Sequence, residues 1–384
     1  MARTNGHIYR DYRKGKPGKT KRSFGVSFLL FILDVVMITV MLVCAAATIV
    51  CIVTPNSDPQ RMGILSTVVL GAPIIYIVLV CTLFYWILRW KWTIAFVTIV
   101  FVIVGSFSVG KYYQIYFKQQ STAIYPNHLK VISYNIHNTN TRAIVDTLAQ
   151  HAPHIVCLQE YKTDSGFVWN ELGRYHKRKA DRKINSTVRG QEKYSCEIFT
   201  NQRIIRQGLI DSLPRINAIW ADILYNKDTV RVINLHLKST TITAQDIEFV
   251  EGHQYVLDSA RKSKIRSITD RLVENNVYRS AQARKVAQFI EQSRPMKMIV
   301  CGDFNDVPLS YSYNTIAANL VDTHTAAGSG YRHTFNGFFR LLPIDYILTS
   351  EDIQTLTYET DYNIENSDHY PVIARLKIDK QDKN

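Results

Sequence analysis

Cysteine is scarce in this sequence and is never clustered. The 384 residues include six cysteines, with no Cys-x-x-Cys pair and no grouping of cysteine with histidine. This argues against a disulfide framework and against a structural zinc site, which both need such groupings. Two of the three cysteines after residue 126 fall within predicted strands, where a thiol packs as a small hydrophobic group.

Acidic residues are outnumbered by basic ones. Residues 126–384 also lack internal repeats, low-complexity segments and added nucleic-acid modules such as a helix-hairpin-helix. The 46 Lys and Arg against 32 Asp and Glu give a formal net charge of +14. Residues 1–23 alone hold eight basic residues and one acidic residue. Because most of the basic excess lies beside long apolar runs, the high pI is weak evidence for nucleic-acid binding.

Residues 24–110 are almost wholly apolar and predict about three transmembrane helices. The apolar runs cover about 24–53, 63–88 and 93–109, and a bilayer is crossed by ~20 helical residues. The first run is too long for the core of a cleaved signal peptide, and further runs follow it. Its charged residue, Asp34, is expected at the interface or against a neighbouring helix.

Positive charge flanks the apolar runs unevenly. Lys and Arg gather in the basic tail 1–23 and at 89–91, whereas the loop 54–62 carries only Arg61. The positive-inside rule therefore predicts a cytoplasmic N-terminus and, after three crossings, an extracytoplasmic soluble part. We expect an integral protein of a plasma membrane or a bacterial inner membrane, and the orientation inverts if the first or third run does not cross.

The rest of the chain has the composition of a soluble domain. Residues 111–127 are predicted to be a juxtamembrane connector, 128–378 an α/β domain of alternating strands and helices, and 379–384 a tail. The loop 174–189 is the densest basic cluster of the domain. Such loops are usually solvated surface, and binding of a substrate phosphate is the alternative.

One predicted strand ends in a group of polar residues. The apolar run 298–301 is followed by Gly302, Asp303, Phe304 and Asn305. Alternate residues of an extended chain point the same way, so Asp303 and Asn305 are expected to face one spot while Phe304 packs inward. A carboxylate beside an amide suits a metal-bound phosphate and its attacking water. Asp and Asn are also common at ordinary strand-to-turn junctions, so this stretch alone leaves both interpretations open.

The other predicted strands end in polar residues too. Together the strand ends offer Asn135, Glu160, His236, Asp303 with Asn305, Asp345, and Asp368 with His369. Each residue alone is common at a strand end. Burying so many polar groups without a shared task would be costly, so the set indicates one functional site.

Six short motifs carry a resemblance to a known family. They are Ser133-Tyr134-Asn135, Leu158-Gln159-Glu160, Asn234-Leu235-His236-Leu237, Gly302-Asp303-Phe304-Asn305, Ile344-Asp345-Tyr346-Ile347 and Ser367-Asp368-His369-Tyr370-Pro371-Val372. In this order, over roughly residues 128–378, they resemble the motif set of the endonuclease/exonuclease/phosphatase family. The resemblance implies a four-layer α/β sandwich, with two central β-sheets flanked by helices, preceded here by about three transmembrane helices. It also implies phosphoester hydrolysis with a divalent metal, Mg²⁺ or alternatively Mn²⁺.

The resemblance also implies roles for the matching residues. The metal ligands would be Glu160, Asn135 and Asp368, and the catalytic residues would be His236, Asp303, Asn305, Asp345 and His369. Asp303 would orient or deprotonate the attacking water, with Asn305 positioning it. His369 would pair with Asp345, and His236 would contact a phosphate oxygen or the leaving group. Which histidine is the acid stays open.

Two positions depart from the family pattern. His137 stands where some nuclease members carry Asp, so the metal shell would use fewer carboxylates. The Ile-Asp pair at Asp345 lacks the directly preceding Arg of many members, for which Arg332 or Arg340 would substitute. The candidate substrate-binding residues are therefore His137, Lys238 and Arg332.

The sequence thus predicts a membrane-anchored, divalent-metal-dependent phosphoesterase. Its substrate would be nucleic acid or the head group of a phospholipid or inositol phosphate. The anchor favours a lipid, and the basic loop is compatible with nucleic acid. The lipid bilayer is the other expected partner, and no protein partner is inferred. The alternative is a catalytically silent binding or scaffolding module of the same fold, which the presence of every core motif residue disfavours.

Overall fold

The computed structural model describes most of the apolar region and most of the soluble domain. The described residues are 24–115, 128–137, 139, 142–162, 182–185, 194–210, 216–240, 245–246, 249 and 259–378. The predicted tails 1–23 and 379–384, most of the connector, and the basic loop 174–189 apart from residues 182–185 lie outside them.

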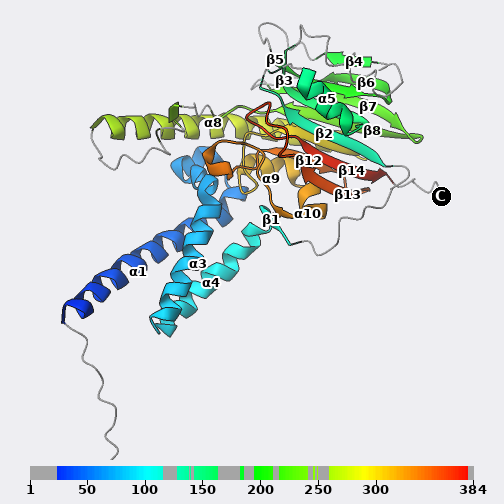
Figure 1. Cartoon of the computed structure of the whole chain (residues 1–384). Helices are drawn as coiled ribbons and strands as arrows, with labels where there is room; N and C mark the ends of the chain where they lie inside the picture. Colours follow the sequence, from blue (N-terminus) through cyan, green and yellow to red (C-terminus); the bar gives the residue numbers. More distant parts are fainter. Residues whose placement is uncertain are drawn as a thin grey trace, which may run out of the picture.

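Long apolar helices come first along the chain, and strands with interspersed helices follow (Figure 1). The helices are α1 (Phe24–Val53), η1 (Thr54–Asn56), α2 (Pro59–Met62), η2 (Gly63–Gly71), α3 (Ala72–Leu88), α4 (Trp92–Val109), α5 (Arg142–Gln150), α8 (Ser259–Gln292), α9 (Tyr311–Ala317), α10 (Thr323–Ala327) and η3 (Phe338–Arg340). The strands are β1 (Tyr113–Gln114), β2 (Leu129–Asn135), β3 (Ile155–Lys162), β4 (Arg182–Asn185), β5 (Tyr194–Thr200), β6 (Arg203–Leu209), β7 (Asn217–Tyr225), β8 (Asp228–His236), β9 (Lys297–Asp303), β10 (Val321–Asp322), β11 (Gly330–Tyr331), β12 (Asp345–Thr349), β13 (Ile353–Thr360) and β14 (Val372–Ile378).

Two six-stranded sheets form the soluble domain. One has the strand order β13-β14-β2-β3-β5-β4 and the other β10-β12-β9-β8-β7-β6. In the middle of each sheet lies a parallel pair, β2 with β3 and β8 with β9, flanked by antiparallel neighbours. Strands β2 and β9 are buried along their whole length. In β9 the burial matches the apolar run 298–301, whereas β2 holds Lys130 and Ser133 among its apolar residues.

The sheets pack face to face and are covered by helices on their outer faces. The core between them includes Val131, Cys157, Val232 and Cys301. On one outer face Ile144 and Leu148 of α5 pack against the β2–β3 sheet, and on the other α8 and α9 pack against the β8–β9 sheet. This helix-sheet-sheet-helix arrangement confirms the predicted four-layer sandwich. The thiols of Cys157, Cys196 and Cys301 are fully buried within it, as their positions in strands predicted.

Three helical stretches are long and apolar enough to cross a membrane: Gly25–Asn56, Pro59–Leu88 and Trp92–Val109. For the second stretch the apolar run predicted one continuous α-helix, but the structure has an interruption there. Residues 63–71 form the 3-10 helix η2, and a new α-helix starts at Ala72, with Pro73 in its first turn. Proline fits the first turn of a helix because it has no N–H to donate, so the chain restarts there.

Polar contacts connect the apolar helices to one another and to the domain of the two sheets. Near the end far from the domain, Arg89 of α3 donates to both carboxylate oxygens of Asp34 at 2.9 and 2.7 Å. Of the two predicted settings for Asp34, the structure has the one against a neighbouring helix. At the near end, Asn276 of α8 donates to Ser66 Oγ of η2 at 3.2 Å.

A second attachment follows the last spanning helix. Strand β1, just after α4, pairs with β11 of the soluble domain. The backbone N–H of Arg332 donates to the carbonyl of Tyr112 at 3.0 Å, next to this pairing. The apolar helices and the sandwich are therefore joined at two places, through η2 and through β1 (Figure 1).

Candidate active site

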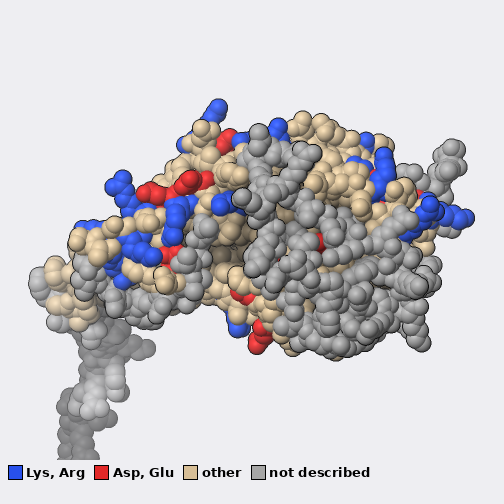
Figure 2. Space-filling model, turned by 90° about the horizontal axis from the view of Figure 1, so that it is seen from above, with Lys and Arg blue, Asp and Glu red and all other residues tan. Residues whose placement is uncertain are grey.

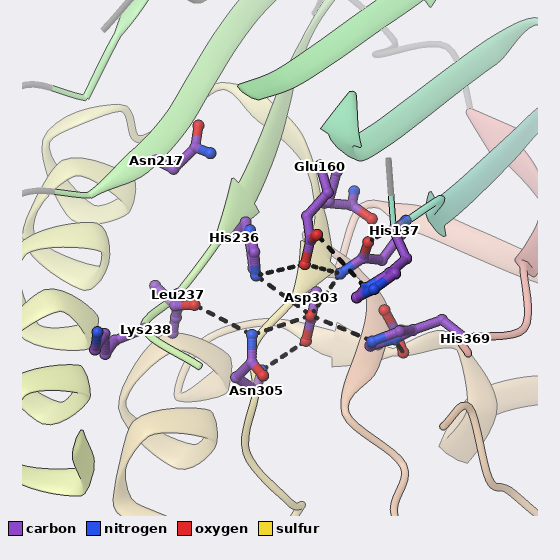
Figure 3. A network of polar contacts seen from close by, with 12 residues as sticks. His137, Glu160, Asn217, His236, Leu237, Lys238, Asp303, Asn305 and His369 are labelled. Atoms are coloured by element: carbon purple, nitrogen blue, oxygen red, sulfur yellow. Dashed lines mark hydrogen bonds and ion pairs between the residues drawn. The ribbon is translucent and has the colours of Figure 1, made fainter. Parts of the chain in front are cut away.

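The ends of the central strands bring the predicted polar residues together. In the β8–β9–β12 register, Asp303 lies opposite both His236 and Asp345. The amide of Asn135, at the end of β2 in the other sheet, donates to Asp303 Oδ2 at 3.0 Å. The two sheets therefore meet at one polar cluster (Figure 3). Because the ends of neighbouring parallel strands lie side by side, this grouping could be predicted from the sequence.

Asp303 is the centre of the cluster. Its Oδ2 accepts from the amides of Asn135 and Asn305, each at 3.0 Å. The Nε2 atoms of His236 and His369 lie 3.5 and 3.9 Å from the same oxygen. The other oxygen, Oδ1, accepts the backbone N–H of Asn305 at 2.8 Å. Asp303 is 1% exposed, and these donors offset the cost of burying its charge.

Gly302 allows strand β9 to approach β8 closely enough to form this centre. Its φ is +140°, and a Cβ at this position would lie 1.9 Å from the carbonyl oxygen of Leu235. No side chain fits such a contact, and this backbone conformation is one that glycine adopts easily. The next residue, Asp303, is thereby held opposite His236, while Phe304 packs against Tyr346 in the core as predicted.

His369 and Asp345 form a buried pair. His369 Nδ1 lies 2.9 Å from Asp345 Oδ2. Burial raises the pKa of Asp345 to about 6, and the facing His369 opposes that rise. Burial alone would lower the pKa of His369, but the carboxylates of Asp345 and Asp303 raise it to about 10. At neutral pH the pair is therefore a carboxylate with an imidazolium whose Nε2 faces the cluster.

Glu160, Asp368 and His137 form the open side of the cluster. Glu160 is at a bulge in β3 with a φ of +53°, which turns its carboxylate out of the strand pairing. The side chains of Glu160, Asp368 and His137 are 24%, 42% and 60% exposed. His137 Nδ1 lies 3.7 Å from Glu160 Oε2 and 3.5 Å from Asp368 Oδ1. These separations exceed hydrogen-bond length, so the three groups are near one another without being bonded.

Two sets of ligands in this cluster could hold a divalent metal ion. Asp303, Asp345 and His369 each place one ligand atom within 4.8 Å of the others, but His369 and Asp345 already bond to each other. Glu160 and Asp368 are carboxylates on the exposed side. Magnesium prefers one or two carboxylates together with several waters, so its chemistry fits the Glu160 and Asp368 side better than the buried pair.

Asn135 lies in the cluster, and both ends of its amide are bonded to the protein. Its Oδ1 accepts the backbone N–H of His137 at 3.0 Å, and its Nδ2 donates to Glu160 and Asp303. A backbone donor on one end and two carboxylates on the other fix the orientation of the amide. In this arrangement Asn135 orients the carboxylates, and its role as a metal ligand stays a prediction from the resemblance.

Two predicted substrate-binding residues do not join the cluster. Arg332 is 1% exposed, and its Nη1 donates to both oxygens of Asp322 at 2.9 Å. It is the cation of a buried ion pair, and the structure does not bring it to the cluster. The exposed side chain of Lys238 lies apart from the cluster in Figure 3, and its backbone binds Gln282 and Arg279 of α8.

Three residues that support the cluster were not assigned from the sequence. Thr334 Oγ1 accepts the N–H groups of Ile344 and Asp345 at 2.9 and 3.0 Å. Ser367 Oγ donates to the carbonyl of Asn135 at 2.8 Å. Asp306 accepts from Arg279 Nε at 3.0 Å. Ser367 was visible as a polar member of a motif and Asp306 as the residue directly after one, whereas nothing local distinguishes Thr334.

Comparison with known proteins decides the family. The model of the endonuclease/exonuclease/phosphatase family matches residues 132–369, which contain the whole cluster. The chain belongs to this family. The family hydrolyses phosphoester bonds and generally uses divalent metals. The apolar region matches a separate model, described as a domain of unknown function (DUF8431), over residues 27–112. No curated protein matches the chain.

Solved structures of the same fold are distant in sequence. The catalytic domain of human Nocturnin with bound sulfate is 17% identical, with a TM-score of 0.48, and the match covers 66% of this chain and 96% of that one. A family member from Bacteroides vulgatus is 15% identical, with a TM-score of 0.48 and coverage of 66% and 100%. A mannosyl-6-phosphatase from Bacteroides thetaiotaomicron is 16% identical, with a TM-score of 0.45 and coverage of 65% and 99%.

Proposed function

We propose that this protein is a membrane-anchored hydrolase that cleaves a phosphoester bond with the help of Mg²⁺ or Mn²⁺. The observation that carries the proposal is the convergence on Asp303 Oδ2 of two amide donors at 3.0 Å and two imidazole nitrogens at 3.5 and 3.9 Å. A buried carboxylate held in this way, beside an exposed pair of further carboxylates, has the geometry of a general base next to an ion site.

Glu160 and Asp368 are the residues that would hold the ion. Asn135 orients Glu160 through its amide at 3.2 Å. When bound, the ion would neutralise charge on the phosphoryl oxygens and orient the phosphate. His137, which lies between the two carboxylates, would contact the ion or a substrate phosphate.

The remaining residues would carry out the proton transfers. Asp303 takes a proton from water as the water oxygen bonds to phosphorus and the bond between phosphorus and the leaving oxygen breaks. Asn305, with its amide on Asp303 Oδ2 and on the carbonyl of Leu237 at 3.2 Å, positions the carboxylate. His236 gives a proton to the leaving oxygen, since its side chain is 16% exposed at the edge of the cluster.

His369 has a different role in this proposal. Its Nδ1 is bound to Asp345 at 2.9 Å and its side chain is only 6% exposed. A locked, cationic imidazole facing the cluster would stabilise the negative charge that develops on the phosphoryl oxygens. The two histidines would therefore have different roles: His369 would be the electrostatic stabiliser and His236 the general acid.

The charge distribution over the described surface is mixed. Figure 2 shows Lys and Arg interspersed with Asp and Glu along α8, the long helix that extends to the left. Nucleic-acid backbones are recognised through continuous stretches of positive charge. With eight Lys or Arg against three Asp or Glu, α8 keeps both a nucleic acid and a smaller phosphoester among the candidate substrates.

Hydrolysis by the full chain in detergent micelles tests the proposal. The panel is plasmid DNA, RNA, sphingomyelin, phosphatidic acid and inositol phosphates, each with Mg²⁺ or Mn²⁺. We expect Asp303→Asn to lower turnover of the accepted substrate by roughly 10²- to 10⁴-fold, the usual contribution of a general base. Asp270→Asn, which makes the same change at a 72% exposed position on α8, serves as the control.

The outcomes separate the proposal from its alternative. Loss of turnover in Asp303→Asn, with Asp270→Asn at the wild-type level, supports the enzyme. A folded full chain that hydrolyses no member of the panel with either metal would instead favour the catalytically silent module. Turnover that survives in Asp303→Asn would refute the assignment of the base.

A further inference from the structure

An apolar cavity of about 180 Å³ lies where the spanning helices meet the soluble domain. Its walls come from the domain-side ends of α1, α3 and α4, including Cys51, Ile75 and Val109. The soluble domain contributes Leu309 and Tyr331. The cavity is therefore shared between the apolar region and the domain that carries the polar cluster.

The lining suits hydrocarbon and not a charged group. No Lys, Arg, Asp or Glu is among the described residues that line the cavity. The hydroxyl of Thr48, one of its few polar groups, donates to the carbonyl of Cys44 in its own helix at 2.8 Å. The hydroxyls of Tyr112 and Tyr331, which also line the cavity, donate to the carbonyls of Val69 and Leu341 at 3.5 and 2.7 Å. With these hydroxyls bonded to the protein, an apolar chain fills the mainly apolar cavity favourably.

The height of the cavity in the helix bundle favours a membrane lipid as the occupant. Cys51 lies in the last turn of α1, Ile75 in the first turn of α3 and Val109 at the end of α4. Each is within about two turns, roughly 10 Å, of the end of its helix. A lipid tail at that depth reaches the cavity without leaving the hydrocarbon layer, while its head group stays at the level of the soluble domain.

A continuous set of apolar side chains connects the cavity with the polar cluster. We call it the junction cluster, and it consists of Cys51, Val69, Tyr112, Val307, Leu309, Leu342 and Ile344. Cys51 and Leu309 also line the cavity. At its other end, Ile344 immediately precedes Asp345, and Phe335, which packs against the junction cluster, has its ring 5.2 Å from that of His369.

The chain leaving Asp303 makes the same connection. From Asp303 to Leu309 the backbone covers six residues, at most roughly 20 Å when extended. On the way, Asp306 is fixed by Arg279 of α8 at 3.0 Å, and α8 itself packs against η2 of the apolar region. Asp303 in the polar cluster and Leu309 in the wall of the cavity are thus at most roughly 20 Å apart within the same domain.

We propose that the cavity holds the hydrocarbon tail of a lipid whose phosphoester reaches the polar cluster, so that the substrate is a membrane lipid. This inference rests on the proposed phosphoesterase function. The tail and the phosphate would be recognised at separate places: the tail by the shared cavity, and the phosphate by the charged residues around Asp303.

Filling the cavity tests the inference in the full chain reconstituted in nanodiscs. Val109→Phe places a ring in the cavity, and Val104→Phe, on the same helix and 38% exposed outside it, is the matched control. We measure turnover of long-chain phosphatidic acid and sphingomyelin, and of the soluble p-nitrophenyl phosphate and bis(p-nitrophenyl) phosphate. A ring that displaces about two methylene groups should lower the ratio of lipid to soluble turnover by about tenfold.

A binding measurement makes the test independent of turnover. Phosphatidic acid with a diazirine in its acyl chain is photolysed in the nanodisc, and labelled peptides are identified by mass spectrometry. We expect label on the peptides that contain Ile75 and Leu309, reduced in Val109→Phe and retained in Val104→Phe.

The two measurements distinguish the possible failures. Labelling of the cavity without hydrolysis of any substrate would support the tail site and refute the proposed function. Hydrolysis of soluble esters or nucleic acid, with an unchanged turnover ratio in Val109→Phe and no label at the cavity, would refute the tail site while leaving the hydrolase standing.

Discussion

His324 makes the folded protein sensitive to mild acid. It lies in α10 and is 1% exposed, with its ring 5.0 Å from that of Tyr358. Burial and the Arg332 cation together lower the pKa of His324 to about 3, against the opposing effects of Asp322 and of a hydrogen bond with the Gly330 backbone. An unfolded histidine has a pKa of about 6.5. The folded state therefore holds His324 neutral over a range in which the unfolded chain takes up a proton.

The sign and size of the effect follow from this difference. Because the folded pKa is below the unfolded one, the unfolded state binds more protons as the pH falls below about 6.5, and stability decreases. Between pH 7.5 and pH 5 the expected loss of unfolding free energy is about 2 kcal/mol. The pKa of Asp322 is lowered by Arg332 despite burial, so its loss of stability comes only at lower pH, below about 4.

Guanidinium unfolding of the full chain in detergent, followed by tryptophan fluorescence at pH 7.5, 6.5, 5.5 and 5.0, measures the effect. His324→Gln keeps a neutral polar side chain and removes the titration. We expect the variant to be less stable at pH 7.5 because packing is lost, but to lose about 2 kcal/mol less than wild type on going to pH 5. His137→Gln, which removes an exposed imidazole, controls for the loss of a histidine. Equal pH dependence in wild type and His324→Gln would refute the reasoning.

Three further predictions follow from the fold and the site. Gly302→Ala should lower the unfolding free energy by more than about 3 kcal/mol, because of backbone strain and a clash with Leu235. The control is Gly330→Ala, at a φ of +75° with open space around it, which should cost about 1 kcal/mol. Equal losses for the two variants in guanidinium unfolding would contradict this prediction. The Mn²⁺ concentration that half-saturates the protein, measured by electron paramagnetic resonance, should rise at least tenfold in Glu160→Gln. An unchanged concentration would count against Glu160 as a ligand. A reporter enzyme fused after Asn384 should show an extracytoplasmic location, and a cytoplasmic location would overturn the predicted three crossings.

Sequence reasoning located the cluster because its residues sit at the ends of strongly apolar strands. The pairing of parallel strands then brings His236 beside Asp303 without any further information. The family motifs also carried the pairing of His369 with Asp345, which the structure shows at 2.9 Å. These are relations that strand order and motif order already contain.

Other features depend on contacts between residues far apart in the chain. Arg332 is drawn into the core by Asp322 and by the ring of Tyr346, whose centroid is 4.8 Å away, and neither partner marks it as buried in the sequence. The orientation of Asn135 is decided by the backbone of His137 and the carboxylate of Asp303. Strand β6, which is exposed along most of its length, and the 3-10 helix η2 were missed because packing partners, more than local propensity, determine them.

The double attachment of the soluble domain has a kinetic consequence. Because η2 is packed on α8 and β1 is paired with β11, the polar cluster is held at a fixed distance from the apolar helices. If these helices cross a membrane as proposed, the cluster stays at one height above it. Encounters with a lipid would then occur by lateral diffusion within a plane. The rate would follow the mole fraction of substrate in the bilayer, and dilution with inert lipid at constant bulk concentration would slow the reaction.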